Sequence, residues 1–229
     1  MAERPIFIPT DSGDYLVQEE MVSFKWDAGM AISQARKRIQ KLHEASREQC
    51  SLQNLLEISS KSLDPIGVEL SAFNLSMNHK GQFSTVESMY QGSKVFKHGG
   101  PFTELLCEKS IVAKKDPRIR ESGPLIGFEL KSESWPLEPT YAFYDWLYLN
   151  ALLENQRLAD ELSKYEAFTD IEFNPKKSFN CQARTAALYS SLFRRGKLEE
   201  VLASRDSYLD FLSNHRHGKP YQGSLSFGD

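Results

Sequence analysis

Three residues, Glu87, Gln91 and Lys94, follow one another at spacings of four and three within residues 84–96. If this segment is helical, as its apolar residues at helical spacing predict, the three side chains lie on one stripe about 60° wide. Glu87 and Lys94 are the only charged residues in these three turns, whereas helices that face water usually carry more charge. We therefore expect a mostly buried helix that carries a carboxylate, an amide and an amine along the edge of a pocket.

A lysine in an apolar site can act as a nucleophile, because burial disfavours the ammonium form and would lower the pKa of Lys94. The neutral amine could displace the base from the anomeric carbon of an N-glycoside. After ring opening it would hold the sugar as a Schiff base until water releases it. Glu87 would shuttle the protons, and Gln91, Asn74 and Asn180 would bind sugar hydroxyls. A neighbouring carboxylate raises a lysine pKa, so this chemistry requires that desolvation outweighs Glu87.

A purely structural interpretation of the segment also stays open. Ser84 with Glu87 three residues later is a capping-box pattern, so Glu87 could simply close the start of the helix. Lys94 could extend its ammonium group to solvent. Charges seven residues apart cannot form the usual i, i+4 surface pair, however, and a bound ligand could bridge them.

The same segment resembles the signature of the NADAR family, a T-V-E-H-x-x-Q-x-x-K-F type of run. Here it reads Thr-Val-Glu-Ser-Met-Tyr-Gln-Gly-Ser-Lys-Val-Phe at 85–96. Upstream, Leu-Ser-Ala-Phe-Asn-Leu at 70–75 resembles the F-S-N-F-Y segment of that family. The whole chain resembles the bacterial NADAR proteins encoded beside DarT-type DNA ADP-ribosyltransferases. Further runs that are typical of those proteins stand at 56–62, 169–175 and 180–184.

The resemblance covers roughly residues 1–200 and implies an antitoxin that removes ADP-ribose from guanine bases in DNA by cleaving the N-glycosidic bond. Its functional partner would be a DarT-type toxin, and no cofactor is implied. Lys94 matches the signature lysine and is the candidate covalent nucleophile, with Lys61 in reserve; Glu87 and Asp170 are the other candidate catalytic residues. Ser88 stands where a His is usual, so the role of that His is absent here or is supplied elsewhere.

Other residues are expected to bind the substrate. The cationic run at 113–120 could be an ordinary solvated segment, but in the family that the chain resembles this run lies near the ligand, which implies a contact with the diphosphate of ADP-ribose. Aromatic rings would stack on a base or ribose, and polar residues of the loop at 168–180 would complete the site. The expected binding residues are Ser71, Phe73, Asn74, Tyr90, Gln91, Lys61, Lys114, Arg118, Trp146, Asn174, Asn180 and Arg184. The pocket is expected to be lined by Glu87, Lys94, Asn74, Asp170 and Asn180.

Other functions stay open. An N-glycosidase of a riboflavin-pathway type of metabolite, or an inactive module that only binds ADP-ribose, would use the same pocket. An antitoxin could also bind its toxin directly through residues 1–50. The helix expected at 31–47 has a basic face, which is either an ordinary solvated surface or a phosphate contact. The sequence does not decide between DNA, RNA and free nucleotide, nor does it give the oligomeric state.

The composition describes a chain of 229 residues with a formal charge of −3 and 40% hydrophobic residues. This suffices for a sizeable core and gives no global attraction to nucleic acid or acidic membranes. No run approaches the ~20 apolar residues of a membrane span, and the N-terminus lacks a signal-peptide layout, so we expect a cytoplasmic protein. Cys50, Cys107 and Cys181 are far apart, and no metal-ligand spacing occurs, so reduced thiols and no metal are expected.

At least five helical segments against four or five short apolar runs predict an α+β fold, a predominantly helical single domain with a small β-sheet. Besides 31–47 and 84–96, helices are expected at 139–153, 157–164, 181–195 and 197–212. Strands are expected at 5–10, 21–26, 55–59, 67–73 and 125–130. Residues 1–50 would form an N-terminal extension, 51–212 the catalytic domain and 213–229 a flexible tail.

Overall fold

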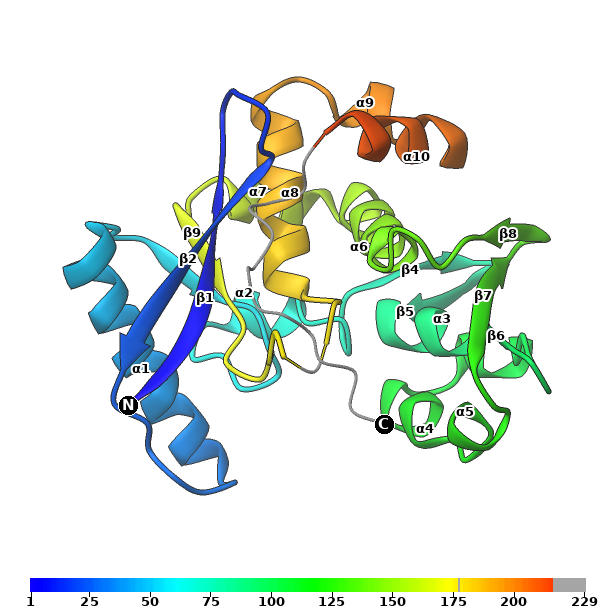
Figure 1. The fold of residues 1–229 in the computed structure, drawn as a ribbon, viewed down its shortest axis with the longest axis horizontal. Helices are drawn as coiled ribbons and strands as arrows, with labels where there is room; N and C mark the ends of the chain where they lie inside the picture. Colours follow the sequence, from blue (N-terminus) through cyan, green and yellow to red (C-terminus); the bar gives the residue numbers. More distant parts are fainter. Residues whose placement is uncertain (177, 216–229) are drawn as a thin grey trace. The chain divides into compact units, whose positions relative to one another are not determined.

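The computed structural model describes residues 1–176 and 178–215 (Figure 1). In this part of the chain the fold is α+β, with more residues in helices than in strands and with small sheets, as predicted. None of the described helices combines the length and the hydropathy that a membrane crossing requires.

The chain forms two compact units, which are described separately. Unit 1 comprises Met1–Glu57 with the described residues from Tyr165 onward, and unit 2 comprises Ile58–Lys164. The chain thus leaves unit 1 once and returns to it once. The division into an extension, a catalytic domain and a tail, with boundaries at 50 and 212, stays a prediction, and most of the predicted tail lies outside the described residues.

Unit 1 is built on a four-stranded sheet with the order β2-β1-β9-β3. β1 (Ala2–Pro9) and β2 (Val17–Phe24) form an antiparallel hairpin. β9 (Ala167–Thr169) pairs antiparallel with β1 and parallel with β3 (Leu55–Glu57). A parallel pair needs a long connection, and here the connection is the whole of unit 2. The strands predicted in the first 60 residues are confirmed, although β1 and β2 begin earlier than predicted.

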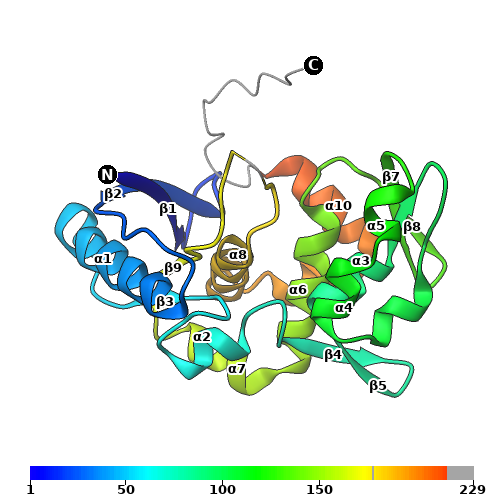
Figure 2. The same ribbon diagram turned by 90° about the horizontal axis from the view of Figure 1, so that it is seen from below.

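Two long helices cover opposite faces of this sheet: α1 (Ile32–Cys50) and α8 (Gln182–Arg194) (Figure 2). Both confirm predicted helices. α1 buries one stripe of side chains at helical spacing, which packs on one face of the β1–β2 hairpin because alternate strand residues point the same way. The core on this face consists of Ile6, Val22, Phe24, Ile39, Leu42 and Ile171. α8 contacts β1, β2 and β9.

The last predicted helix, at 197–212, is divided into α9 (Leu198–Val201) and α10 (Arg205–Asn214). Ser204 causes the division, because its hydroxyl accepts a hydrogen bond from the backbone N–H of Ser207 at 3.0 Å and so starts a new helix. A serine that is followed by a polar first turn favours a helix start over a helix interior.

Unit 2 surrounds α6 (Ala142–Glu154), which confirms the predicted aromatic helix and buries side chains on nearly every side. The hydroxyl of Tyr148, a fully buried residue of α6, donates a hydrogen bond to the carbonyl of Leu70 at 2.7 Å. Two small antiparallel sheets lie in this unit, β4-β5 and β6-β7-β8. Their strands are β4 (Ser76–His79), β5 (Gln82–Thr85), β6 (Lys94–Phe96), β7 (Leu125–Leu130) and β8 (Glu133–Trp135).

Short helices make up most of the remainder of unit 2. They are α2 (Pro65–Glu69), α3 (Val86–Gly92), the 3₁₀ helix η1 (Thr103–Cys107), α4 (Ser110–Lys115), α5 (Arg118–Glu121) and α7 (Gln156–Leu162). The strand predicted at 67–73 is wrong, because α2 begins just before it. The side chain of Asp64 caps α2 by accepting from the N–H of Ile66 at 2.9 Å, and Pro65 occupies the first turn.

The helix predicted at 84–96 is shorter than expected, since α3 ends at Gly92 and Lys94 begins strand β6. A Cβ atom at Gly92 would lie 2.9 Å from Cδ2 of Leu106, so only glycine lets η1 pack this closely against the end of the helix. Lys94 then pairs with Phe128 of β7. The apolar residues after Lys94 therefore belong to a strand, although their composition is also compatible with a helix.

Candidate active site

The start of α3 is capped by Thr85 and not by Ser84. The hydroxyl oxygen of Thr85 accepts from the N–H of Ser88 at 3.2 Å and lies 2.7 Å from the hydroxyl of Ser110. The capping-box interpretation of Glu87 is therefore wrong, and its carboxylate is available for partners further along the helix.

Ser88, which replaces the usual His of the signature run, has a structural role here. It is fully buried, and its hydroxyl donates to the carbonyl of Glu108 at 2.7 Å. This bond fixes α3 against the segment between η1 and α4. The position therefore contributes packing and no titratable group.

Glu87, Gln91 and Lys94 form a hydrogen-bonded relay. Nε2 of Gln91 donates to Oε1 of Glu87 at 3.0 Å, and Nζ of Lys94 donates to Oε1 of Gln91 at 2.7 Å. Glu87 and Gln91 are both buried, with 6% of their surface exposed. Nζ of Lys114, on α4, approaches Oε1 of Glu87 at 3.6 Å. The three side chains thus lie on one stripe, as their spacing predicts, although Lys94 reaches it from a strand.

The electrostatic surroundings favour a neutral amine at Lys94. Burial lowers the pKa of Lys94 to about 8, against the opposing effect of Glu87 and with help from the positive charge of Lys114. Desolvation therefore outweighs the neighbouring carboxylate, which is the condition that a nucleophilic lysine requires. At neutral pH about a tenth of the Lys94 side chains would carry a neutral amine.

Each of the two lysines lies over an aromatic ring. Nζ of Lys94 is 4.7 Å from the ring centroid of Tyr90, and Nζ of Lys114 is 4.8 Å from that of Phe73. The Tyr90 ring is itself packed on Phe128 at 5.3 Å between centroids. Such contacts hold the ammonium groups in place.

Three of the other predicted binding residues of unit 2, which are Ser71, Asn74 and Lys61, make hydrogen bonds to neighbouring residues of the chain. The Ser71 hydroxyl donates to the carbonyl of Val68 at 2.8 Å. Nδ2 of Asn74 donates to the same carbonyl at 2.8 Å and to the Ser71 hydroxyl at 3.0 Å. Nζ of Lys61 donates to the Ser60 hydroxyl at 2.8 Å. Asn74 is exposed, so its side chain can meet a ligand while it keeps these bonds.

Arg118 and Trp146 also have protein partners of their own. The guanidinium of Arg118 donates to the carboxylates of Asp116 at 2.9 Å and Glu104 at 2.5 Å, which raise the pKa of Arg118 further. A diphosphate would have to compete with both carboxylates for it. The half-buried ring of Trp146 packs on Trp135, with 5.3 Å between centroids.

The predicted catalytic residue Asp170 belongs to unit 1, where it directly follows β9 and is buried. Its Oδ1 accepts from the backbone N–H groups of Glu172 at 3.1 Å and Phe173 at 3.2 Å, and its Oδ2 accepts from Nε2 of Gln182 at 3.1 Å. Burial, together with the neighbouring charge of Glu57, raises the pKa of Asp170 to about 8. The coupled pair of carboxyl groups, Asp170 and Glu57, therefore favours sharing one proton at neutral pH.

Glu57 belongs to a buried network in unit 1 that the sequence did not lead us to predict. Its Oε2 accepts from the hydroxyl of Thr169 at 2.6 Å, and its Oε1 accepts from the N–H of Ile171 at 2.9 Å. Nε2 of His43 lies 2.9 Å from the Thr169 hydroxyl, which it can reach as a donor. Burial and Arg47 lower the pKa of His43 to about 4, so the ring is neutral. The one signal in the sequence is an acid inside the apolar run Leu-Leu-Glu-Ile at 55–58.

Asn174, Asn180 and Arg184 also lie in unit 1. Oδ1 of Asn174 accepts from the N–H of Lys176 at 3.0 Å, and burial raises the pKa of Glu19 against the opposing effect of the positive charge of Arg184. That Asp170 and Asn180 line one pocket with the residues of the Glu87 relay stays a prediction.

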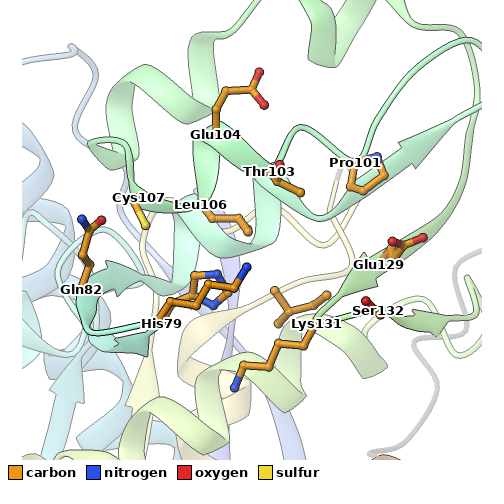
Figure 3. A pocket seen from close by; sticks show the side chains of 12 residues that line it. His79, Gln82, Pro101, Thr103, Glu104, Leu106, Cys107, Glu129, Lys131 and Ser132 are labelled. Atoms are coloured by element: carbon orange, nitrogen blue, oxygen red, sulfur yellow. The ribbon is translucent and has the colours of Figure 1, made fainter.

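A pocket of about 550 Å³ lies elsewhere in unit 2 (Figure 3). Side chains of the two hairpins β4–β5 and β7–β8 face those of η1 and the chain before it. It is lined by His79, Lys80, Gln82, Pro101, Thr103, Glu104, Leu106, Cys107, Glu129, Leu130, Lys131 and Ser132. None of the predicted site residues is among these, so this pocket is distinct from the Glu87–Gln91–Lys94 relay.

Within the described residues, no three His, Cys, Asp or Glu side chains are grouped so that they could hold a metal ion. Cys50, Cys107 and Cys181 are free thiols.

The signature run, now seen as an amine–amide–carboxylate relay on an α+β fold, is that of NADAR proteins. A family model described as "DarT1-associated NADAR antitoxin" matches residues 2–222, and the chain belongs to this family. This confirms the resemblance found in the sequence and associates the protein with a DarT-type toxin. No curated protein matches the chain.

Proposed function

We propose that this antitoxin is a glycohydrolase that removes ADP-ribose from guanine bases in DNA and thereby reverses the modification made by a DarT-type toxin. One observation carries the proposal: Lys94, with a pKa lowered to about 8, is hydrogen-bonded through Gln91 to the buried carboxylate of Glu87. A nucleophile that titrates near neutral pH and a carboxylate that can move protons are the two groups that cleavage of an N-glycosidic bond needs.

In the proposed mechanism, neutral Nζ of Lys94 attacks the anomeric carbon of the ADP-ribosyl group. The bond from that carbon to the guanine nitrogen breaks, and Glu87 transfers a proton from Nζ to the departing nitrogen. The ring carbon–oxygen bond then opens as the ring oxygen takes up a proton, which leaves a protonated imine at Lys94. Water adds to the imine carbon, and collapse of the carbinolamine releases the sugar aldehyde and the lysine. The net reaction consumes one water and yields guanine and ADP-ribose.

Lys114 and Gln91 support this chemistry. Nζ of Lys114 lies 3.6 Å from Oε1 of Glu87, and its charge lowers the pKa of Lys94. Its exposed position also suits a contact with the diphosphate of ADP-ribose. Gln91 has no proton to transfer and acts by fixing the distance between the amine and the carboxylate.

The proposal is tested with purified protein and an oligonucleotide that carries one ADP-ribosylated guanine. We expect free ADP-ribose by chromatography and the mass of unmodified DNA, with no added metal and in the presence of a chelator. Binding without turnover would identify a module that only recognises ADP-ribose. Activity that a chelator abolishes and a divalent ion restores would identify a metal-dependent hydrolase instead.

A further inference from the structure

Two arginines and an exposed tryptophan form a cluster in unit 1. The guanidinium carbons of Arg4, on β1, and Arg38, on α1, lie 4.9 and 4.5 Å from the ring centroid of Trp26, which follows β2. Trp26 has 37% of its surface exposed. Nη1 of Arg38 donates to the carbonyls of Asp27 and Gly29 at 2.9 and 2.8 Å, which fixes the loop that carries Trp26. We call these three residues the Arg4–Trp26–Arg38 cluster.

The cluster holds two like charges in a partly desolvated place. Burial and the charge of Arg38 lower the pKa of Arg4, against the opposing effect of the negative charge of Asp170. The Nε atoms of both arginines are buried and have no hydrogen-bond partner among the described residues. Bringing two guanidinium groups together against one indole costs free energy unless an anion compensates them. The arrangement is therefore suited to receive negative charge.

Three lysines extend this positive surface. Lys25, Lys37 and Lys41 lie within electrostatic reach of Asp27, because a hydrogen bond from Lys41 and the charges of all three lower the pKa of Asp27 against the effect of burial. Nζ of Lys41 lies 2.6 Å from the Asp27 carboxylate. Together with the two arginines over Trp26, these three lysines give this surface five cations, on a protein whose formal charge is −3.

The start of α1 adds to the same potential. Its N-cap residue, Ala31, offers no side-chain acceptor, and the first turn contains no acidic residue. The backbone N–H groups and the positive end of the helix dipole are therefore left without a compensating side chain. The acidic residues of this helix, Glu44 and Glu48, lie in its second half.

We infer that this surface binds the phosphate backbone of single-stranded DNA, the strand that carries the modified guanine; the inference rests on the proposed function and names how its polymeric substrate is held. The five cations are distributed over β1, α1 and the loop after β2, and they are more than a single phosphate group requires. Lys37 and Lys41 are one turn apart, about 6 Å along the helix, which suits successive phosphates. Basic side chains interleaved with an exposed aromatic ring are typical of single-strand binding surfaces. The exposed apolar side chains of Met30 and Ile32 adjoin the loop and offer further contacts for bases.

The test measures binding of the full chain to a short, unmodified, fluorescein-labelled single strand by fluorescence anisotropy at several salt concentrations. We expect the logarithm of the affinity to fall linearly with the logarithm of salt concentration. The double variant Lys25→Gln/Lys37→Gln removes two charges whose side chains are exposed. It should weaken binding about tenfold or more at low salt and reduce the slope by about 1.4, or about 0.7 for each lost phosphate contact.

A charge-matched control is Lys164→Gln/Lys197→Gln, which removes two exposed lysines that pair with nearby acids of their own segments. It should leave affinity and slope unchanged. A third variant, Trp26→Phe, locates the strand. The wild type should show quenching of tryptophan fluorescence on binding, and this variant should lose that signal while it still binds.

Three results would overturn the inference: no binding of the strand by the wild type, an unchanged salt slope in Lys25→Gln/Lys37→Gln, or an equal loss of affinity in the control variant.

A parallel experiment measures binding to vesicles that contain phosphatidylserine. If the variant loses vesicle binding but keeps DNA binding, the surface is a membrane contact. Because the strand is unmodified, the assay gives its answer even if the proposed glycohydrolase activity fails. If that activity is found, the variant should raise KM for a modified strand and leave turnover of a modified mononucleotide unchanged.

Discussion

Each unit of the molecule buries a network around carboxylates, and the two networks compensate the charge differently. In unit 2 the carboxylate of Glu87 has the ammonium group of Lys114 at 3.6 Å and that of Lys94 one amide away. In unit 1 the carboxyl group of Asp170 lies within electrostatic reach of Glu57, and backbone N–H groups, a hydroxyl and an amide donate to the two groups.

Burial therefore favours the neutral form of the titrating group in both networks, although one group is a base and the other an acid. In unit 2 it lowers the pKa of a base, Lys94, and in unit 1 it raises the pKa of an acid, Asp170, and both pKa values come to about 8. A group that titrates near neutral pH can exchange a proton during turnover, which is why perturbed pKa values mark candidate functional sites. The comparison predicts that the two networks respond in opposite ways to pH and to neutralising substitutions.

The largest effect is expected at Lys94. Lys94→Arg keeps the positive charge but does not give up its proton, so activity on ADP-ribosylated guanine should fall about 10³-fold or more. Borohydride should reduce the imine of the wild type and leave the protein heavier by one ADP-ribose unit on the peptide that contains Lys94. Both Lys94→Arg and Lys94→Ala should lose this adduct.

Lys61→Ala is the matched test of that assignment and should retain the trapped adduct. If the adduct maps to Lys61, the Schiff-base mechanism holds and the choice of lysine is wrong. If active enzyme gives no adduct at all, attack by a water that Glu87 deprotonates becomes the preferred mechanism, and Lys94 is left with an electrostatic role.

The next effect concerns Glu87. Glu87→Gln keeps the shape of the side chain and loses proton transfer, so turnover should fall about 10²–10⁴-fold. Binding of ADP-ribose, followed by calorimetry, should remain measurable. A variant that loses binding and turnover together would show that Glu87 holds the ligand or the fold and does not serve as the proton carrier.

A smaller effect is expected on the pH profile. Since attack needs the neutral amine, kcat/KM should rise with pH through about 8, the pKa of Lys94. Lys114 lowers that pKa, so Lys114→Gln should move the rising limb to higher pH, by about one unit or less. Lys115→Gln, a neighbouring exposed lysine, is the control and should leave the limb in place. An unchanged limb in Lys114→Gln would mean that the limb does not report Lys94.

Local patterns sufficed for the long elements of this fold. α1, α6 and α8 were predicted because apolar residues recur over three or more turns, which no strand reproduces. The end of α3 was not predictable in this way, because the apolar residues after Lys94 fit a strand or a helix. The choice depends on the close contact of Gly92 with Leu106, which lies in another segment.

The same distinction, between local and long-range determinants, applies to the candidate site. The relay in unit 2 could be predicted because Glu87, Gln91 and Lys94 lie within eight residues of sequence and their spacing brings them to one stripe. The unit 1 network could not, since the bond between Glu57 and Thr169 joins residues 112 positions apart through a parallel strand pair. Only the register of that pair brings the carboxyl groups together.

The smallest effect, on stability alone, separates the two networks most clearly. The pKa of Asp170 is raised from an ordinary 3.8 in the unfolded chain to about 8 in the fold. Between these pH values the folded protein holds a proton that the unfolded chain has released, so stability should fall as pH rises from about 4 to 8 and then level off. The side chain of Asn in Asp170→Asn cannot ionise, so the urea midpoint of this variant should vary less with pH than that of the wild type across this range.

The contribution of Lys94 to the pH dependence of stability has the opposite sign. Its lowered pKa costs stability most below pH 8, and that cost is relieved as pH rises toward 10.5. Urea midpoints of the wild type, Asp170→Asn and Lys94→Ala at several pH values test both signs at once. Parallel curves for the wild type and Asp170→Asn would place the shared proton on Glu57, and Glu57→Gln would then be the variant that flattens the curve.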